Sequence, residues 1–106
     1  MLIGWTTVES ATQAEALAAG LVEARLAACV QIEGPIRSHY RWEGRCQQAD
    51  EMRVMIKFFP DRQQELEAWL FSRHTYQTPA WVVIETTHVA EKYLSWARAN
   101  STSVTL

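Results

Sequence analysis

The sequence is poor in the residues that carry recognisable covalent or metal chemistry. It has two cysteines and three histidines in 106 residues. Cys29 and Cys46 lack the C-x-x-C spacing of a redox or zinc motif, and no two histidines have the H-x-x-x-H or H-E-x-x-H spacing of a zinc helix. There is no glycine-rich phosphate loop and no Ser–His–Asp set in a recognisable context. These absences argue against the enzyme classes that such motifs identify.

The chain also lacks a strong excess of charge and a long apolar run. Its net charge is −2, and lysine and arginine are scattered along the sequence, which argues against nucleic acid or an anionic membrane as the partner. No apolar run approaches the ~20 residues that cross a bilayer. The first residues lack the basic segment and cleavage site of a secretory signal. We therefore expect a cytoplasmic protein with reduced thiols.

A disulfide between Cys29 and Cys46 is not expected. A tight turn at 43–44 would put Cys46 opposite roughly Arg41 and Cys29 opposite roughly Phe58, on the order of 40 Å apart at the rise of a strand. A disulfide needs Cα atoms ~4–7 Å apart. Cys29 is then either a small buried hydrophobe or a thiol available to a metal or to redox chemistry, and Cys46 is an incidental exposed thiol.

The apolar pattern predicts a single domain over 1–106. Residues 14–27 have the periodicity of an amphipathic helix, and Asp61 is positioned to cap a second helix, which ends before a loop at 73–79. A third helix is expected at 91–99. Strands are expected at 2–8, 27–32, 36–42, 51–59 and 80–89, with a further edge strand at 101–106. Gly34-Pro35 predicts a bulge or bend within the second strand.

This order of elements is typical of an α+β fold of the ferredoxin-like split βαβ type, β-α-β-β-α-β plus a short C-terminal helix. A helix layer on one face leaves the other face of the sheet in need of cover. Paired strands of ten or more residues exceed the usual length of about five or six. We therefore expect the long hairpin to pair with a neighbouring subunit, and some of the five tryptophans to pack at subunit interfaces.

Candidate binding residues come from a loop and from one strand. His74 lies in a loop with Tyr76 and Pro79, and binding residues concentrate in loops. His74 is therefore either a binding residue or a residue that satisfies hydrogen bonds of the loop itself. Lys57 lies among apolar residues, so it must extend to solvent, pair with a carboxylate or face a polar cleft. The aromatic residues are either interface packing or the walls of such a cleft. The residues of this candidate inter-subunit cleft are Cys29, Tyr40, Trp42, Lys57, His74, Tyr76, Tyr93 and Trp96.

The carboxylates do not form a recognisable acid–base pair. They are spread over different predicted elements, and nothing in the sequence brings two of them together. Most are interpreted as solvated charges. The acidic residues considered are Glu9, Glu33, Glu43, Glu51 and Glu85.

Several separate stretches resemble the CutA divalent-cation tolerance proteins. They are RLAACVQI and SHYRWEG within 25–44, IK at 56–57, HTYQTP at 74–79 and YLSW at 93–96. Their order and spacing match the family over nearly the whole chain. The resemblance implies a ferredoxin-like subunit in a tight homotrimer, with the sheets facing inwards and the long hairpins pairing across subunits. It also implies a link to tolerance of copper and other divalent cations.

The chain departs from the family pattern at positions relevant to ligand binding. A carboxylate is missing after Pro79, and two of the ligands proposed for copper in some relatives are replaced. Of that set His74 remains, and it is the candidate ligand for Cu(II) or another divalent cation. The departures are Trp5 for Cys, Gln31 for Asn, Arg73 for His, Thr75 for Pro and Ala80 for Glu.

The leading interpretation is a non-enzymatic homotrimer that binds a divalent metal ion or a small anionic ligand in a cleft between subunits and acts in copper tolerance. One rival is a small-molecule sensor like the trimeric PII-type regulators, by analogy of fold alone. A second is an enzyme that uses Lys57, His74 and Tyr76 as acid and base. A third is a structural trimeric scaffold.

Overall fold

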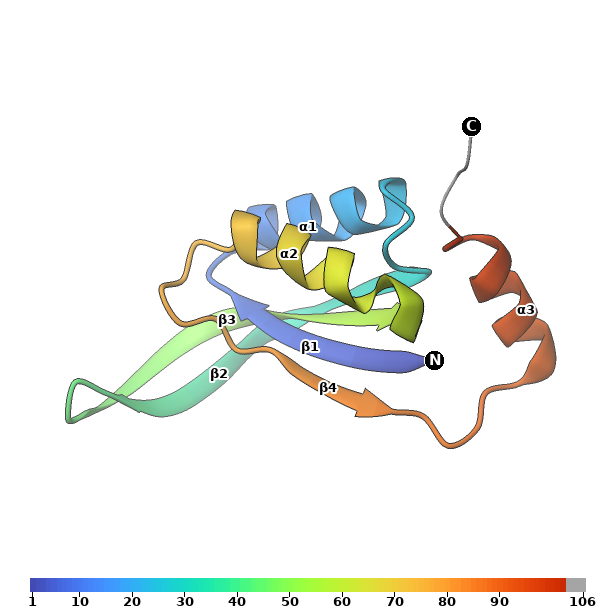
Figure 1. Ribbon diagram of the computed structural model, residues 1–106. Helices are drawn as coiled ribbons and strands as arrows, with labels where there is room; N and C mark the ends of the chain where they lie inside the picture. The colour runs from blue at the N-terminus through green and yellow to red at the C-terminus, as the bar shows by residue number, and fades with distance from the viewer. Residues whose placement is uncertain (103–106) are drawn as a thin grey trace.

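Four antiparallel strands form one sheet, and two helices lie across one of its faces (Figure 1). This computed structural model describes residues 1–102. The strand order is β2-β3-β1-β4, and the chain follows the predicted β-α-β-β-α-β order with a C-terminal helix. The elements are β1 (Leu2–Val8), α1 (Ala11–Glu23), β2 (Cys29–Trp42), β3 (Arg45–Phe58), the 3-10 turn η1 (Pro60–Arg62), α2 (Gln63–Arg73), β4 (Val82–Glu85) and α3 (Glu91–Ala99).

Most predicted elements are confirmed, with shifted boundaries. The strand at 2–8 and the helix at 91–99 have the predicted bounds. Helix α1 begins at Ala11 because the Ser10 hydroxyl accepts a hydrogen bond from the Gln13 N–H, at 3.2 Å. It stops at Glu23, and Arg25 just beyond has a positive φ of 60° that a right-handed helix does not allow. The predicted helix at 14–27 was therefore placed too late.

Two local predictions differ from the structure, and a third lies largely outside it. Asp61 does not cap the second helix: α2 has Arg62 at its N-cap position, without a side-chain cap. The Asp61 carboxylate instead accepts a hydrogen bond from Arg98, at 2.7 Å. The strand predicted at 80–89 is confined to Val82–Glu85, which is where β1 offers it a partner. The strand predicted at 101–106 lies, beyond Thr102, outside the described residues.

The core lies between the sheet and the two helices. Alternate residues of β3, namely Val54, Ile56 and Phe58, are fully buried, as the period of a strand requires. Leu21 of α1 and Leu66 of α2 cover them with no exposed surface of their own. Burying one such side chain stabilises the fold by about 1.5–3 kcal/mol. The helix layer is therefore fixed to one face of the sheet by its apolar stripes.

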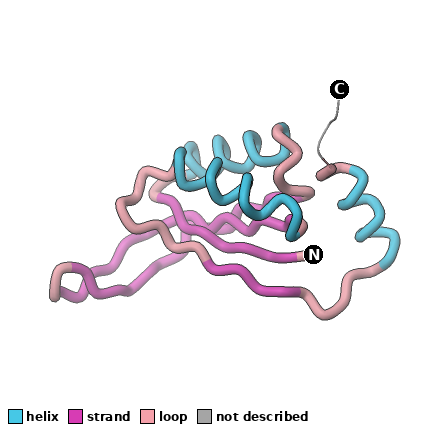
Figure 2. Tube along the Cα trace, viewed as in Figure 1, coloured by secondary structure: helices cyan, strands magenta, loops and turns pink. Residues whose placement is uncertain are grey.

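The β2–β3 hairpin extends beyond the helix layer, as the tube view also shows (Figures 1 and 2). Each of its strands has 14 residues. The register shifts between Glu33 and Ile36, at the predicted Gly34-Pro35 irregularity, where Gly34 has a φ of 146°. Glu43 and Gly44 both have positive φ and close the hairpin. The long hairpin predicted from the sequence is confirmed, and both cysteines are free thiols.

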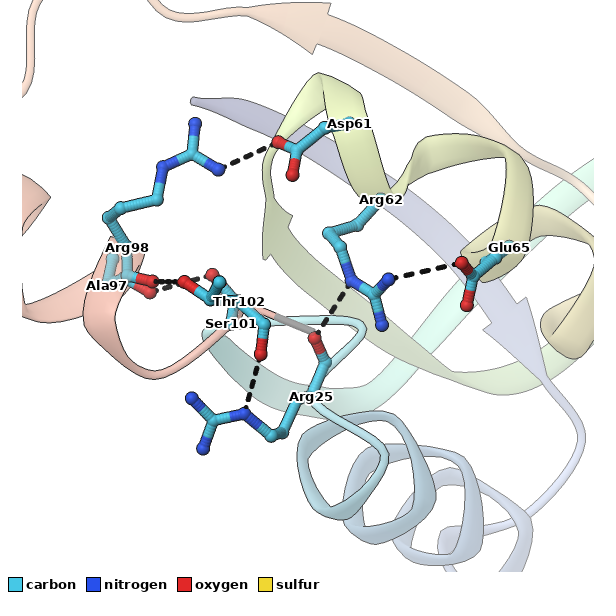
Figure 3. Close-up of polar contacts among 8 residues, drawn as sticks. All are labelled: Arg25, Asp61, Arg62, Glu65, Ala97, Arg98, Ser101 and Thr102. Carbon is cyan, nitrogen blue, oxygen red and sulfur yellow. Dashed lines mark hydrogen bonds and ion pairs between the residues drawn. The ribbon is translucent and has the colours of Figure 1, made fainter. Parts of the chain in front are cut away.

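Helix α3 packs against the end of the sheet away from the hairpin tip and is held by arginine side chains (Figure 3). Arg25 donates hydrogen bonds to the carbonyl oxygens of Ala99 and Thr102, each at 2.8 Å. Arg98 on α3 pairs with Asp61, and this contact lowers the pKa of the carboxyl. The two Arg25 bonds satisfy carbonyl groups at the end of α3. The start of this helix has no side-chain cap.

The second face of the sheet carries apolar side chains that no helix of the described residues covers (Figure 1). Val82 and Ile84 of β4 are 59% and 48% exposed. Trp5 lies between Met55 and Val82 in the register of the sheet, and Ile3 lies beside Ile84. We call Ile3, Trp5, Met55, Val82 and Ile84 the open face. Within residues 1–102, no helix combines the length and apolarity needed to span a membrane.

Candidate functional site

A cavity of about 700 Å³ lies between the hairpin and the loop that follows α2. Its size falls within the range of small-molecule sites, about 300–1,000 Å³. Its surface is mainly apolar, with hydroxyl and amide groups from the loop. The lining residues are Thr7, Ser38, Tyr40, Trp42, Glu51 and the loop residues 75–80.

Glu51 is the one charged residue that lines this cavity in the described part of the chain. It is only 8% exposed, and its Oε2 accepts a hydrogen bond of 2.7 Å from the Tyr76 hydroxyl. Within residues 1–102 its other oxygen, Oε1, has no hydrogen-bond partner, and it is not among the fully enclosed unpaired atoms. Oε1 is therefore open to the cavity. Burial, together with the Glu51 carboxylate, raises the pKa of Tyr76 far above its usual value, so the phenol stays protonated.

His74 uses both of its ring nitrogens to fix this loop. Nδ1 accepts a hydrogen bond from the Tyr76 backbone N–H at 3.2 Å, so the ring proton belongs on Nε2. Nε2 lies 3.0 Å from both the Thr7 carbonyl oxygen and the Thr6 hydroxyl, and donates to the carbonyl. Burial lowers the pKa of His74, against the opposing effects of Thr7 and the Glu51 charge. The neutral ring therefore ties the end of α2 to β1.

A second group of aromatic residues surrounds a lysine at the other end of the sheet. The Lys57 ammonium lies 3.4 Å from the Tyr93 hydroxyl and 5.2 Å from the centre of the Tyr93 ring. Tyr93 stacks on Trp96, with ring centres 5.6 Å apart, and Trp96 is 48% exposed. Cys29 pairs with Lys57 in the register of β2 and β3. Within residues 1–102, Lys57 thus reaches an aromatic surface rather than a carboxylate partner.

The candidate cleft residues consequently fall into two sets within one chain. We call Tyr40, Trp42, Glu51, His74 and Tyr76 the hairpin cluster, and Cys29, Lys57, Tyr93 and Trp96 the α3 cluster. Along β2 the span from Cys29 to Tyr40 is roughly 35 Å at ~3.3 Å per residue. A single chain therefore brings the predicted residues together in two places, not in one cleft.

Glu51 is the cavity residue that sequence reasoning missed. Its parity along β3 places it on the same side as Lys57, opposite Val54 and Ile56, and this signal is present in the sequence. The loop that covers it is not predictable from that parity, because Tyr76 meets Glu51 across 25 residues of chain. Without that contact, the sequence analysis interpreted Glu51 as a solvated charge.

The described residues hold no group of three or more His, Cys, Asp or Glu side chains arranged to bind a metal ion. His39 and His88 are exposed, and neither lies on the cavity. His74 is accessible to a metal only if one of its ring nitrogens gives up its present hydrogen bond. The geometry by itself is that of a cavity lined by one carboxylate, beside a histidine whose ring nitrogens both form hydrogen bonds.

Comparison with known proteins gives consistent matches along the chain. The family of the CutA1 divalent ion tolerance protein matches residues 2–100. The divalent-cation tolerance protein CutA of Pectobacterium atrosepticum is 39% identical over 87 residues, covering 82% of this chain and 79% of that protein. CutA of Escherichia coli K12 is 39% identical over 95 residues, covering 90% and 84%. The structure of the divalent cation tolerance protein from Thermus thermophilus superposes with a TM-score of 0.91 at 32% identity, covering 96% and 100%.

Proposed function

The chain belongs to the CutA1 family of divalent ion tolerance proteins, and we propose that it acts in divalent cation tolerance as a non-catalytic homotrimer with a ligand cleft between subunits. The observation that carries the proposal is the separation of the two clusters. Each presents aromatic rings around one charged group, and one chain holds them at opposite ends of its sheet. A second copy would bring the two ends side by side and enclose a cleft between them.

The open face supports assembly. It is apolar and contiguous across β1, β3 and β4, and exposed apolar patches of this kind mark interaction surfaces. The hairpin extends past the helices and presents the outer edge of β2, whose unpaired backbone groups favour strand pairing with another chain (Figure 1). Three copies arranged with their open faces inward would cover this surface and bring each hairpin onto a neighbour.

Copper or another divalent cation is the ion we propose, with His74 as the protein ligand. Imidazole suits copper and zinc, and the ring is neutral at pH 7, as a metal ligand must be. To bind a metal ion, one His74 ring nitrogen would give up its hydrogen bond to the Tyr76 N–H or to the Thr7 carbonyl. The 75–80 loop would then be held less firmly. Metal binding would therefore be coupled to the shape of the cavity.

A non-catalytic role fits the protonation states of the residues once considered as acid and base. Tyr76 stays protonated because it is buried beside a carboxylate, and His74 has no ring nitrogen free to accept a proton. Lys57 lies in the other cluster, away from both. The cavity favours a ligand-binding trimer over a purely structural scaffold, since a scaffold needs no carboxylate inside a cavity. We place this trimer in the cytoplasm, where Cys29 and Cys46 would remain reduced.

Native mass spectrometry with and without one equivalent of Cu(II) per subunit tests the proposal. We expect a trimer, and copper retained by the wild type and by His39→Ala but lost from His74→Ala. His39 is the matched control because it is exposed on the hairpin and does not line the cavity. A monodisperse monomer at micromolar concentration would contradict the assembly. Equal copper retention by His74→Ala would remove His74 from the site.

A further inference from the structure

We infer that the cavity of the hairpin cluster binds a small organic ammonium ion, with Glu51 as its counter-ion. This inference names the ligand class of the proposed cleft and rests on that function. Its starting point is the asymmetry of Glu51. One carboxylate oxygen is bound to Tyr76 at 2.7 Å, and the other is open to the cavity without a protein partner in the described chain.

The charge of the cavity selects a cation. Glu51 is more than nine-tenths buried, and no arginine, lysine or histidine lines the cavity with it among residues 1–102. Its carboxylate therefore faces the cavity with no cationic side chain of the described residues in the lining. An anionic ligand would meet a buried like charge at close range. The small anion included in the sequence interpretation is therefore unfavourable here.

The walls of the cavity favour an organic cation over a metal ion. Tyr40, Trp42 and Tyr76 contribute aromatic rings, and rings attract a cation that approaches their faces. A divalent metal ion needs several oxygen, nitrogen or sulfur ligands, and Glu51 is the one acidic group in this lining. A singly charged ammonium ion requires one counter-charge and benefits from the apolar surface around its carbon substituents.

The hydroxyl and amide groups of the loop complete the match. Thr75, Gln77 and Thr78 line the same cavity as the free Glu51 oxygen. A primary ammonium ion has three N–H donors, and one carboxylate oxygen with loop oxygens can accept them. A quaternary ammonium ion such as choline has no N–H donor, so it would rely on the Glu51 charge and the aromatic rings, with its hydroxyl group left to bond the loop. Tyr76 holds Glu51 in place by its hydrogen bond, so the carboxylate is oriented before a ligand arrives.

Isothermal titration calorimetry with choline tests the inference without any variant. Its uncharged carbon isostere, 3,3-dimethylbutan-1-ol, has nearly the same shape, and acetate supplies the opposite charge. We expect choline and butylamine to bind the wild-type trimer, and the neutral isostere to bind about tenfold or more weakly because it lacks the charge. Acetate should not bind. Equal affinity for choline and the isostere would overturn the inference.

Two variants locate the binding site. Glu51→Gln keeps the shape and the acceptor for Tyr76, and should weaken choline about tenfold or more by removing the buried charge. Glu15→Gln removes the same charge from the exposed side of α1 and should leave choline affinity unchanged. Loss of affinity in both variants, or in neither, would contradict a site at Glu51.

A third possible outcome is that Lys57 of a second copy occupies the cavity. In that case choline would not bind the wild type but would bind Lys57→Met, and the inference of a ligand site would be wrong. The oligomeric state and the copper content of the same samples are measured by native mass spectrometry. A trimer that retains copper through His74 but ignores choline would reject the ammonium site and leave the proposed function standing.

Discussion

Two ends of the same sheet carry aromatic side chains, yet they surround charges of opposite sign. At the hairpin cluster the charge is a buried carboxylate, Glu51, held by Tyr76 under a loop that His74 fixes. At the α3 cluster it is the ammonium group of Lys57, which lies against Tyr93. The aromatic composition is similar, so the difference lies in the charged residue and in how it is held. An aromatic cluster in a sequence therefore predicts a surface, but not the sign of what that surface binds.

The two ends of the sheet also differ in the contacts that hold them to the rest of the fold. The hairpin cluster is held through a neutral histidine that bonds backbone and side-chain groups within the sheet layer. The α3 end is held by the half-buried Arg25 and the exposed Arg98 (Figure 3). Part-buried hydrogen bonds that leave unpaired groups when broken are costly to lose, whereas exposed contacts of charged side chains contribute little. We therefore expect substitutions at the hairpin cluster to have the larger effects.

The largest effect is expected from His74→Ala. It removes the bonds to Thr6, Thr7 and the Tyr76 N–H, and should lower the free energy of unfolding by about 2–3 kcal/mol. Chemical denaturation measures this change. His39→Ala, on the exposed part of the hairpin, should change stability by less than about 0.5 kcal/mol. Similar losses in the free energy of unfolding for the two variants would contradict the view that His74 holds the loop while His39 does not.

A smaller effect is expected at the other end from Arg25→Asn. Asparagine tolerates the positive φ of position 25 but loses the bonds to Ala99 and Thr102, at a cost of about 1 kcal/mol. Hydrogen exchange should show lost protection in α3 while β1 and β3 keep theirs. Uniform loss of protection throughout the sheet would show that the arginine bonds hold more than the last helix.

Acid should weaken the hairpin cluster specifically. The folded pKa of His74 lies below the ordinary value of about 6.5, so the unfolded chain binds a proton before the folded chain does. This contribution to stability is complete above about pH 6.5 and is lost as the pH falls from there through the lowered pKa. Thermal unfolding across this range should show a decline that is absent in His74→Gln. An identical decline in that variant would assign it to other groups.

The smallest effect is expected from Asp61→Asn. The Asp61–Arg98 pair is close, at 2.7 Å, but both side chains are about half exposed. Such a pair contributes about 0–1 kcal/mol, and added salt screens it. Denaturation of both proteins at low and high salt should give nearly equal stabilities at high salt. A difference that persists in high salt would show that the pair acts as more than a surface contact.

Most of the fold was predictable because it depends on local periodicity. The alternation of Val54, Ile56 and Phe58 indicates a half-buried strand, and Glu43-Gly44 indicates a tight turn. The misplaced cap shows the limit of this approach. Asp61 has the residue type and spacing of a cap, but its carboxylate finds Arg98, far away in sequence, and that contact leaves no local signal.

The site was predictable only in its separate parts. Tyr40, Trp42, His74 and Tyr76 were identified from the loop and strand that carry them. The sequence could not show that Tyr76 reaches Glu51, or that Lys57 lies at the opposite end with Tyr93. The first depends on where the loop after α2 passes the hairpin, and the second on where helix α3 packs beside β3. Long-range placement of this kind determines the chemistry of the cavity.

The central claim is that the two clusters meet between copies of the chain. Replacing Tyr40 with the photo-crosslinker p-benzoylphenylalanine, irradiating the assembled protein and sequencing the joined peptides tests this directly. The account predicts a crosslink between chains, from position 40 to a peptide that contains Lys57 or helix α3. Mixing isotope-labelled and unlabelled chains distinguishes it from a crosslink within one chain. Crosslinks confined to one chain, or inter-chain crosslinks that avoid the α3 cluster, would contradict the account.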